Sequence, residues 1–468
     1  MGNSYFYGEI ALSYMCNLRH KFCFQTSFAP NKLDDEILYH KLIPLYQKLK
    51  SVRILGGEPT IIPGIKEYLA FLKENWPEMD IEIVTNGIAL DAAWLDFVEK
   101  YGINVQISVN GITKEVFSRI MLKGDSERLR ESLYANLERA ITRHHESNKP
   151  ILNCISMVVN KDTEDDLEGI VQFCIANGIN LSLQLSYSMY DRTKGDEQAA
   201  KRICKLVYFC EGIIDAISYN VPKEIQKDIE SNVLNGKLEK EKKHFLDTIS
   251  KIRNSKNKIR TFLYCHEHIY DGKCKMPTRG ITIMPDGFTY SCCGLTRYPL
   301  GNVYFDSIES LMYSDERNLL QKKLNEGCYT YCFDRCPYNL NPLSSINNQI
   351  KVYKLPYKEL FEKGEYSKAA KQYEVISKTS LYGAIERYEH AYCLHVTDTD
   401  IPKAIELYSD AYKRGFSKFW ICYNRADAYI RINELEKAKE DIREAYQLDS
   451  SHDGIRMLYE KYILAEKK

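Results

Sequence analysis

Residues 7–210 alternate between short apolar runs of strand length and longer segments with helical periodicity. The runs expected to form strands are residues 8–13, 52–55, 81–85, 104–109, 151–159 and 180–186. Helical patterns lie between them, near residues 33–49, 61–75, 89–100, 112–144 and 163–177. Strands separated by such helices predict right-handed crossovers and a parallel sheet. We therefore expect an α/β domain over residues 1–210, either a partial (β/α)6 barrel or a doubly wound sheet.

The rest of the chain divides into three segments. Residues 211–260 are charged and predict a helical connector, and residues 261–350 predict a small cysteine-rich α+β domain. In residues 355–468 a Lys-Ala pair recurs at Lys368, Lys403 and Lys437, which are 35 and 34 residues apart. A period of about 34 residues with paired helices is typical of tetratricopeptide repeats, which often bind a peptide or protein in a groove. A plain helical bundle is the alternative.

Charge and hydropathy narrow the classes of function. The 468 residues include 64 basic and 64 acidic side chains, so no overall charge favours nucleic acid or an anionic membrane. No apolar stretch approaches the roughly 20 residues that span a bilayer. The first residues lack the basic and apolar regions of a secretory signal. We therefore expect a cytoplasmic globular protein that binds neither nucleic acid nor a membrane.

Cysteines and turn residues mark the candidate chemistry. Seven of the 15 cysteines fall between Cys265 and Cys336, and Cys16 and Cys23 follow the first expected strand. Without an export signal, clustered cysteines favour metal binding or redox chemistry over disulfides. Polar turns follow the next three strands, at residues 56–59, 85–87 and 108–111. The loops after parallel strands share one edge, so these segments predict a single site.

The loop from Cys16 to Cys23 resembles the radical SAM superfamily, whose signature is C-x3-C-x2-C after the first strand. Cys16, Phe22 and Cys23 match this signature, whereas His20 occupies the place of the middle cysteine. The resemblance implies a [4Fe-4S] cluster with one open iron that binds S-adenosylmethionine. It also implies reductive cleavage to a 5′-deoxyadenosyl radical that abstracts hydrogen from a substrate. Cys16, His20 and Cys23 are the implied cluster ligands and catalytic residues.

The same resemblance extends to the neighbouring turns. Gly56, Gly57 and Glu58 match the segment whose backbone and carboxylate hold the methionyl ammonium group. The resemblance also implies polar contacts to S-adenosylmethionine from Asn86, Ser108 and Asn110. Gln184 and Ser186 are weaker candidates for such contacts.

Three interpretations of His20 remain open. In the first interpretation, the imidazole of His20 ligates iron, as histidines do in Rieske centres. There the replacement of thiolate by neutral imidazole raises the reduction potential of the cluster. Alternatively, the site is degenerate and the cluster is labile, absent or three-iron. In the third interpretation, the chain is a sequence variant of an enzyme with three cysteines.

The later cysteines resemble the SPASM extension of radical SAM enzymes. Twelve residues separate Cys274 from Gly287, and four more lead to Cys292; Pro285, Asp286 and Gly287 independently predict a hairpin turn. Cys332 and Cys336 match the closing C-x3-C, but the pattern is incomplete. We therefore expect one auxiliary [4Fe-4S] cluster, with Cys293, Cys328 and Cys332 as remnants or as a partial second site. The expected ligands are Cys265, Cys274, Cys292 and Cys336, and a zinc site is the alternative.

The sequence thus predicts a radical SAM enzyme of the SPASM or shortened twitch type with a tetratricopeptide-like tail. The resemblance implies modification of a peptide or protein and an external electron donor. One alternative is a catalytically degenerate peptide-binding or protein-binding protein, and another is an enzyme that acts on a small molecule. No general base can be identified from the sequence.

Overall fold

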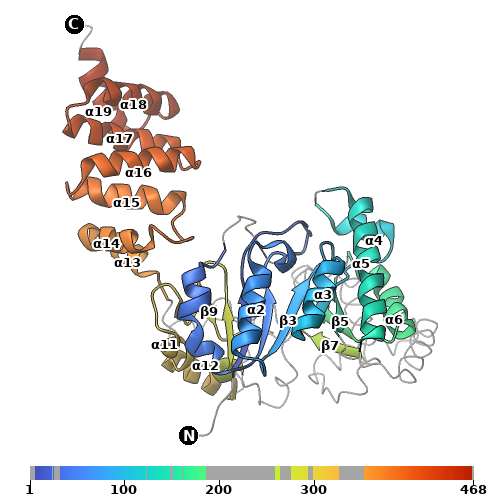
Figure 1. Cartoon of the computed structure of the whole chain (residues 1–468). Coiled ribbons are helices and arrows are strands. Elements are labelled where there is room, and N and C mark those ends of the chain that lie inside the picture. Colours follow the sequence, from blue (N-terminus) through green and yellow to red (C-terminus); the bar gives the residue numbers. More distant parts are fainter. Residues whose placement is uncertain are drawn as a thin grey trace, which may run out of the picture. The chain divides into compact units, whose positions relative to one another are not determined.

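The computed structural model describes residues 6–23, 25, 32–122, 124–147, 151–160, 162–185, 259–263, 276–292, 299–325 and 353–465. The contacts within the chain define two compact units, Met1–Val352 and Tyr353–Lys468. The described part of the first unit combines helices with a sheet, and that of the second is helical (Figure 1).

The sheet of the first unit has the strand order β10-β9-β8-β1-β2-β3-β4-β5-β6-β7. Neighbouring strands from β1 to β7 are parallel, as are β1 and β8, whereas β9 is antiparallel to both β8 and β10. Because β1 to β7 follow one another without a reversal, the arrangement is that of a β/α barrel rather than a doubly wound sheet. The predicted α/β fold class is confirmed. The strands are β1 (Phe6–Ala11), β2 (Leu49–Leu55), β3 (Asp80–Thr85), β4 (Asn104–Ser108), β5 (Leu152–Val159), β6 (Leu181–Leu185), β7 (Ile259–Leu263), β8 (Gly280–Ile283), β9 (Phe288–Tyr290) and β10 (Gly301–Asn302).

Helices follow the parallel strands, and Figure 1 shows α2 and α3 lying over the sheet. In the described part of this unit they are η1 (Ile37–Lys41), α1 (Ile43–Tyr46), η2 (Pro59–Ile61), α2 (Ile65–Asn75), α3 (Ala92–Tyr101), α4 (Lys114–Ile120), α5 (Ser126–Glu146), η3 (Glu164–Asp166), α6 (Leu167–Ala176), α10 (Met276–Arg279), α11 (Ile308–Met312) and α12 (Asp315–Asn325). Strand β7 begins at Ile259, inside the predicted connector, and the rest of that connector lies outside the described residues.

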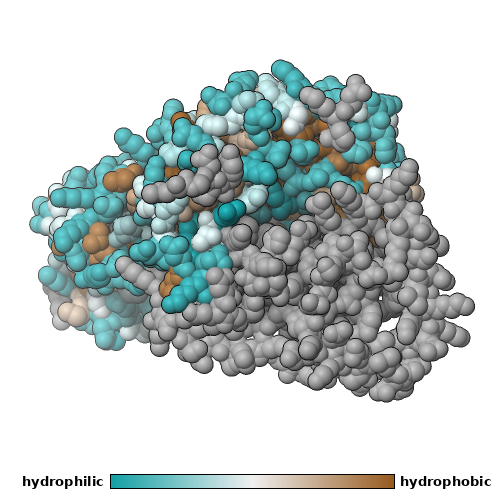
Figure 2. Space-filling model, turned by 90° about the horizontal axis from the view of Figure 1, so that it is seen from below, coloured by the Kyte–Doolittle hydropathy of each residue, from teal (hydrophilic) through white to brown (hydrophobic). Residues whose placement is uncertain are grey.

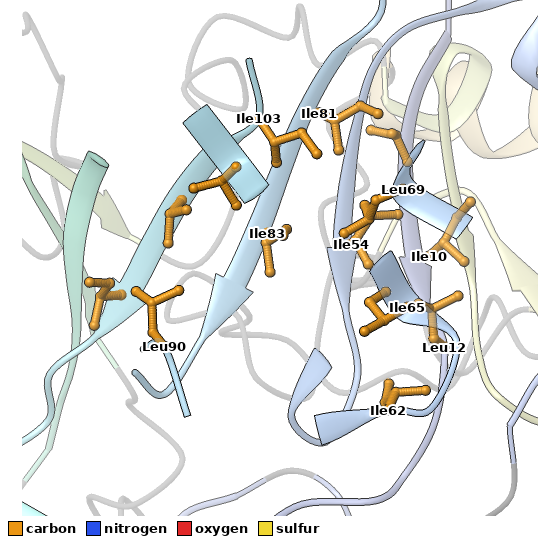
Figure 3. Packing of buried hydrophobic residues seen from close by; sticks show 14 of the residues in the cluster. Ile10, Leu12, Ile54, Ile62, Ile65, Leu69, Ile81, Ile83, Leu90 and Ile103 are labelled. Atoms are coloured by element: carbon orange, nitrogen blue, oxygen red, sulfur yellow. The ribbon is translucent and has the colours of Figure 1, made fainter. Parts of the chain in front are cut away.

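Alternate residues of the central strands form an apolar layer beneath the helices. Ile10, Ile54 and Ile83 are at most 1% exposed and share one core cluster with Ile65 and Leu69 of α2 (Figure 3). Side chains alternate between the two faces of a strand, so every second residue joins this layer. The layer anchors the strands and thereby fixes the loops that follow them.

The opposite face of the sheet is polar. The register pairs Glu9 with Arg53, and Arg53 with Glu82. The Arg53 guanidinium donates to Glu82 at 2.7 Å, to Glu9 at 3.2 Å and to Gln106 at 2.9 Å. Thr282 of β8 donates to Glu9 at 3.1 Å. This face is therefore lined by paired charges and hydrogen-bonding groups rather than by a second apolar layer, as far as the described strands extend.

The helix predicted over residues 112–144 is interrupted. Residues 121–125 separate α4 from α5, and Gly124 there has a φ of 104°, which favours glycine. The interruption pairs with the cysteine loop, because Lys21 N donates to Ile120 O at 2.9 Å and Leu122 N donates to Arg19 O at 2.8 Å. A continuous helix would hold these peptide groups in its own ladder, so contact with the cysteine loop explains the break.

The second unit consists of consecutive helices. They are α13 (Pro356–Glu362), α14 (Tyr366–Ile376), α15 (Ala384–Val396), α16 (Ile401–Lys413), α17 (Lys418–Arg431), α18 (Leu435–Leu448), α19 (Asp453–Tyr459) and η7 (Glu460–Leu464). The alanines of the repeat, Ala369, Ala404 and Ala438, lie on α14, α16 and α18 and are at most 1% exposed. The repeated positions thus have equivalent places in the core, while the tetratricopeptide assignment itself stays a prediction.

None of the helices in the described ranges is long and apolar enough to cross a membrane. On the face drawn in Figure 2, the described surface is mostly hydrophilic and is interrupted by groups of apolar residues.

Candidate functional site

Three turns meet at the carboxyl edge of the sheet. The cysteine loop (residues 12–23) follows β1, the GGEP turn (residues 56–59) follows β2, and the TNG turn (residues 85–87) follows β3. These strands are parallel, so their carboxyl ends share one edge, where sites of such folds form.

The GGEP turn contacts the cysteine loop through its backbone. Gly57 N donates to Ser13 O and Glu58 N donates to Met15 O, both at 2.7 Å. A Cβ atom on Gly57 would lie 2.0 Å from Met15 O, and one on Gly56 would lie 2.6 Å from Ser13 O. Glycine is therefore required at both positions by the close approach of the two segments.

Glu58 links the GGEP turn to the TNG turn. Its carboxylate is 1% exposed and accepts hydrogen bonds from Thr60 N at 3.0 Å, Thr60 Oγ1 at 2.5 Å, Thr85 Oγ1 at 2.6 Å and Asn86 N at 2.7 Å. Burial raises the pKa of this carboxyl, although the hydrogen bonds act in the opposite direction. Among the described residues, only Asn86 N donates a hydrogen bond to Glu58 Oε2. This oxygen can therefore accept a hydrogen bond from one further donor. That capacity fits the predicted contact with an ammonium group.

The other predicted polar residues also connect strand ends. Asn86 Nδ2 donates to Asn17 Oδ1 in the cysteine loop at 2.7 Å. Ser108 Oγ and Ser156 Oγ lie 3.2 Å apart, and Asn110 Oδ1 accepts from Val158 N of β5 at 2.8 Å. Asn86 therefore lies with the cysteine loop, while Ser108 and Asn110 lie where β4 meets β5.

Gln184 lies on β6, opposite Val158 of β5 and Phe262 of β7 in the register. Its side chain and the whole of Ser186 lie outside the described residues.

The cysteine loop brings free thiols to this edge. Cys16 and Cys23 are both half-buried and unbonded to other cysteines. Burial raises the pKa of Cys16 to about 11, and the nearby charges of Glu58 and Cys23 act in the same direction. Burial likewise raises the pKa of Cys23. Cys16, Cys23 and Glu58 are thus close enough to interact electrostatically.

His20 lies in the same loop with its ring stacked on Phe22, at a centroid distance of 5.2 Å and an angle of 11°. Burial lowers the pKa of His20 to about 4, so the imidazole is neutral near pH 7. Two cysteine sulfurs and a neutral imidazole are a donor set that iron accepts. The residues present therefore fit a cluster with one nitrogen ligand.

The ligand atoms of Cys16, His20 and Cys23 do not all lie within 4.8 Å of one another. Within the described ranges, ligand atoms of three such residues gather within 4.8 Å only at Cys422, Asp441 and Glu444 in the second unit. Arg425 already holds Asp441 through two hydrogen bonds of 2.7 Å, which leaves that triad poorly suited to a cation.

The auxiliary site is described only in part. Strands β8 and β9 form the predicted hairpin, and Gly287 adopts a φ of 79° in its turn. Cys292 follows β9 and is 8% exposed. The other expected ligands, Cys265, Cys274 and Cys336, lie outside the described residues, as do Cys293, Cys328 and Cys332.

The register places Cys292 and the cysteine loop toward opposite ends of β1. Gly280 of β8 lies opposite Tyr7 at the start of β1, and β9 runs back from the turn towards that level. Cys16 instead follows the other end of β1. At roughly 3.3 Å per residue, the six residues of β1 span about 20 Å.

Two residues of the site were missed from the sequence. Asp166, which is 4% exposed, accepts from Ile112 N at 2.5 Å and from Thr113 N at 2.8 Å, and so fixes the loop that carries Asn110. Asn160, after β5, is fully buried, and its Nδ2 has no partner among the described residues. An aspartate at the end of the short helix η3 and an asparagine in a loop carry no periodic signal, so only the fold shows their positions.

Two family models match the chain. The model described as the Radical SAM superfamily covers residues 10–174, and the SPASM model, described as an iron-sulfur cluster-binding domain, covers residues 274–337. The α/β fold and the matched domains are thus those of the radical SAM class. More particularly, this chain carries a radical SAM domain followed by a SPASM iron-sulfur domain. These domains imply a [4Fe-4S] cluster with S-adenosylmethionine and an auxiliary cluster.

Curated relatives resemble only part of the chain. Molybdenum cofactor biosynthesis protein 1 of Drosophila melanogaster is 31% identical over 180 residues, which are 37% of this chain and 30% of the relative. GTP 3′,8-cyclase of Syntrophomonas wolfei is 27% identical over 139 residues, which are 28% of this chain and 42% of the cyclase. The chain therefore spans less than half the length of either relative.

Solved structures also resemble the chain. SuiB of Streptococcus suis bound to S-adenosylmethionine has a TM-score of 0.44 and 16% identity, covering 68% of this chain and 66% of SuiB. Native anSMEcpe with bound AdoMet and Kp18Cys peptide has a TM-score of 0.46 and 17% identity, covering 76% of this chain and 96% of that chain.

Proposed function

We propose that this protein is a radical SAM enzyme that modifies a peptide or protein. The observation that carries the enzymatic part is the joining of the three turns: the GGEP backbone holds the cysteine loop, and the buried Glu58 holds the TNG turn. A [4Fe-4S] cluster held by Cys16, His20 and Cys23 would supply the chemistry of reductive cleavage of S-adenosylmethionine, on which hydrogen abstraction from a substrate would depend. An external donor provides the electron.

The residues of the chain have separate roles in this proposal. Cys16, His20 and Cys23 hold the cluster. The GGEP turn orients the methionyl ammonium through its backbone and Glu58, whose second oxygen retains capacity for a donor. The contacts to the carboxylate and ribose come from Asn86, Ser108, Asn110 and Gln184.

A peptide or protein substrate is supported by the SPASM domain and by the second unit. That unit lies outside both matched family models and builds its own core from repeated helix positions. Helical repeats of this kind present extended surfaces that bind peptides or proteins.

A small-molecule substrate is the second candidate. It is favoured by the curated relatives, which include enzymes named GTP 3′,8-cyclase. A catalytically degenerate binding protein on the same fold is the third reading, and it rests on the replacement of a cluster cysteine by His20.

Cleavage of S-adenosylmethionine tests the enzymatic proposal. Anaerobically reconstituted protein is reduced with dithionite, and 5′-deoxyadenosine is measured for the native chain, His20→Cys and a Cys16→Ala/Cys23→Ala control. We expect product from the native chain and none from the control. Product from His20→Cys alone would indicate a pocket disabled at one ligand. Product from none of them would favour the degenerate binding protein.

A further inference from the structure

The turn between β8 and β9 lies at the same edge of the sheet as the cysteine loop. Strand β8 runs parallel to β1 and ends at Ile283, opposite Ile10. The turn that follows β8 therefore lies at the level where the cysteine loop follows β1. In that loop, Tyr14 Oη donates a hydrogen bond at 3.3 Å to Oδ2 of Asp286, which belongs to the turn. The hairpin of the matched SPASM domain thus contacts the cysteine loop directly.

Tyr14 is held at its backbone as well as at its hydroxyl. Its carbonyl accepts a hydrogen bond from the buried side chain of Gln25. Tyr14 precedes Cys16 by two residues, and Gln25 follows Cys23 by two. The contact therefore joins the two ends of the segment that carries the three expected ligands of the N-terminal cluster.

Asp286 is itself fixed within the turn. Its Oδ1 accepts from Phe288 N at 3.3 Å, and its backbone carbonyl accepts from Asn302 Nδ2 at 2.9 Å. Asn302 is fully buried, and a Cβ atom on Gly287 would lie 2.5 Å from the Tyr304 ring. Because closely packed neighbours hold the turn, the carboxylate offers the cysteine loop an acceptor in a defined place.

A second contact reaches the chain just beyond the cysteine loop. Tyr304, which packs against the turn, accepts a hydrogen bond at Oη from Asp34 N at 3.4 Å. Leu33 N donates to Leu12 O at 2.9 Å, which holds this segment beside the start of the loop. The turn and Tyr304 therefore contact the chain near the start of the cysteine loop and beyond its end.

We propose that Asp286 is a positioning residue for the iron site of the cysteine loop and acts through Tyr14. By fixing Tyr14, it holds the entry to the ligand segment against the GGEP turn, whose Glu58 N donates to Met15 O at 2.7 Å. The hairpin thereby supports the N-terminal site without contributing a ligand to it. This proposal rests on the site described in the proposed function, but not on cleavage of S-adenosylmethionine.

Hydrogen exchange of the iron-free, full-length chain tests the contact in the absence of a cluster. Tyr14→Phe and Asp286→Ala each remove the bond. Asp286→Asn keeps a contact on both sides, because its amide oxygen accepts from Phe288 N and its NH2 group donates to Tyr14 Oη. We expect the amides of the GGEP turn to exchange about fivefold faster in the first two variants and at the native rate in Asp286→Asn.

Tyr101→Phe is the matched control for this experiment. Tyr101 Oη also donates to a carboxylate at 3.3 Å, that of Glu74, but this bond joins α3 to α2. Its loss should leave exchange in the GGEP turn unchanged. Native exchange in Tyr14→Phe, or equal acceleration throughout the sheet, would overturn the proposal.

Electron paramagnetic resonance then tests the loaded site. Reconstituted protein is reduced and titrated with S-adenosylmethionine, and the difference between spectra with and without it isolates the cluster that binds it. We expect Tyr14→Phe and Asp286→Ala to need about fivefold more S-adenosylmethionine for half the spectral change, and Asp286→Asn to behave as native. The double variant Tyr14→Phe/Asp286→Ala should be no weaker than either single variant, because all three lack the same bond.

Additive losses in the double variant, or equal losses in Asp286→Asn and Asp286→Ala, would show that Asp286 does not act through Tyr14 and would overturn the proposal. The expected order of affinities without any 5′-deoxyadenosine as product would support the positioning role and contradict the proposed enzyme. The two proposals therefore fail on different results.

Discussion

The GGEP turn and the cysteine loop lie against each other, yet the fold makes different demands on Gly57 and on His20. At Gly57 even a methyl group would overlap Met15 O. His20 serves the loop mainly through its backbone: its carbonyl accepts from Cys23 N at 3.2 Å, and the residue forms a bridge with Met121. The fold thus fixes where residue 20 lies without requiring a particular side chain. An exchange between cysteine and histidine at residue 20 should therefore change the proposed ligand and leave the contacts between the two segments in place.

The largest loss of stability is expected from a substitution at Gly57, where a Cβ atom would overlap the backbone. Gly57→Ala should separate the GGEP turn from the cysteine loop and cost about 3 kcal/mol, because its Cβ meets backbone that cannot move aside. Urea unfolding and iron per chain check this, and both should fall. Gly102→Ala is the matched control: its φ is 62° with nothing near a Cβ, so it should cost only about 1 kcal/mol and spare iron. Equal costs in the two variants would contradict a special role for the contact at Gly57.

Glu58→Gln should have the next largest effect. It places an amide NH2 group among donors that now share a buried carboxylate, at a cost of about 2 kcal/mol. Iron should be retained, because Glu58 is not a ligand, while affinity for S-adenosylmethionine should fall about tenfold, or about 1.4 kcal/mol. Isothermal titration of reconstituted protein measures the affinity. Thr60→Val, which removes one donor to Glu58, should lower the affinity for S-adenosylmethionine less. Native affinity in Glu58→Gln would contradict the role given to the carboxylate.

The neutral His20 ring predicts a pH dependence in the iron-free chain. Its folded pKa of about 4 lies below the ordinary value of 6.5, so the unfolded chain binds more protons at this site between these limits. Stability should therefore fall as the pH is lowered through that window. Between pH 7 and pH 5 the native protein should lose about 1–2 kcal/mol more than His20→Gln. Urea unfolding at the two pH values measures this, and equal losses would contradict a buried neutral ring.

Removal of the second unit should affect the site least. The two units have separate cores, so a chain ending at Val352 should keep its iron and the stability of the sheet unit within about 0.5 kcal/mol. Affinity for a peptide substrate should fall, as measured by fluorescence anisotropy. Unaltered affinity would remove the peptide-binding role given to the repeats, and loss of iron would show that they support the clusters.

The sequence predicted those parts of the molecule that repeat or obey a spacing. Alternation of apolar residues located β1 to β6, and the hairpin before Cys292 followed from its turn residues. The break between α4 and α5 could not be foreseen, because backbone pairing with the cysteine loop, far away in sequence, overrides the helical pattern. Strand β7 and the pairing of β8 with β1 were missed for the same reason: both depend on distant partners.

Within the site, spacing identified the turns but not their internal contacts. The resemblance placed Glu58 beside the ammonium group, and only the structure shows that this carboxylate also ties Thr85 and Asn86 to the GGEP turn. The bond between Tyr14 and Asp286 shows the same limit, because the two residues are 272 positions apart in the sequence.

The central claim is that His20 holds iron in a site where the cysteine loop, the GGEP turn and the TNG turn keep their contacts. The direct test is pulsed EPR of the reduced cluster in protein labelled with 15N-histidine, in a Cys292→Ala background that removes the auxiliary signal. The account predicts a strong nitrogen coupling in this protein and its loss when His20→Cys is added. Absence of the coupling, or its persistence in His20→Cys, would contradict ligation by His20.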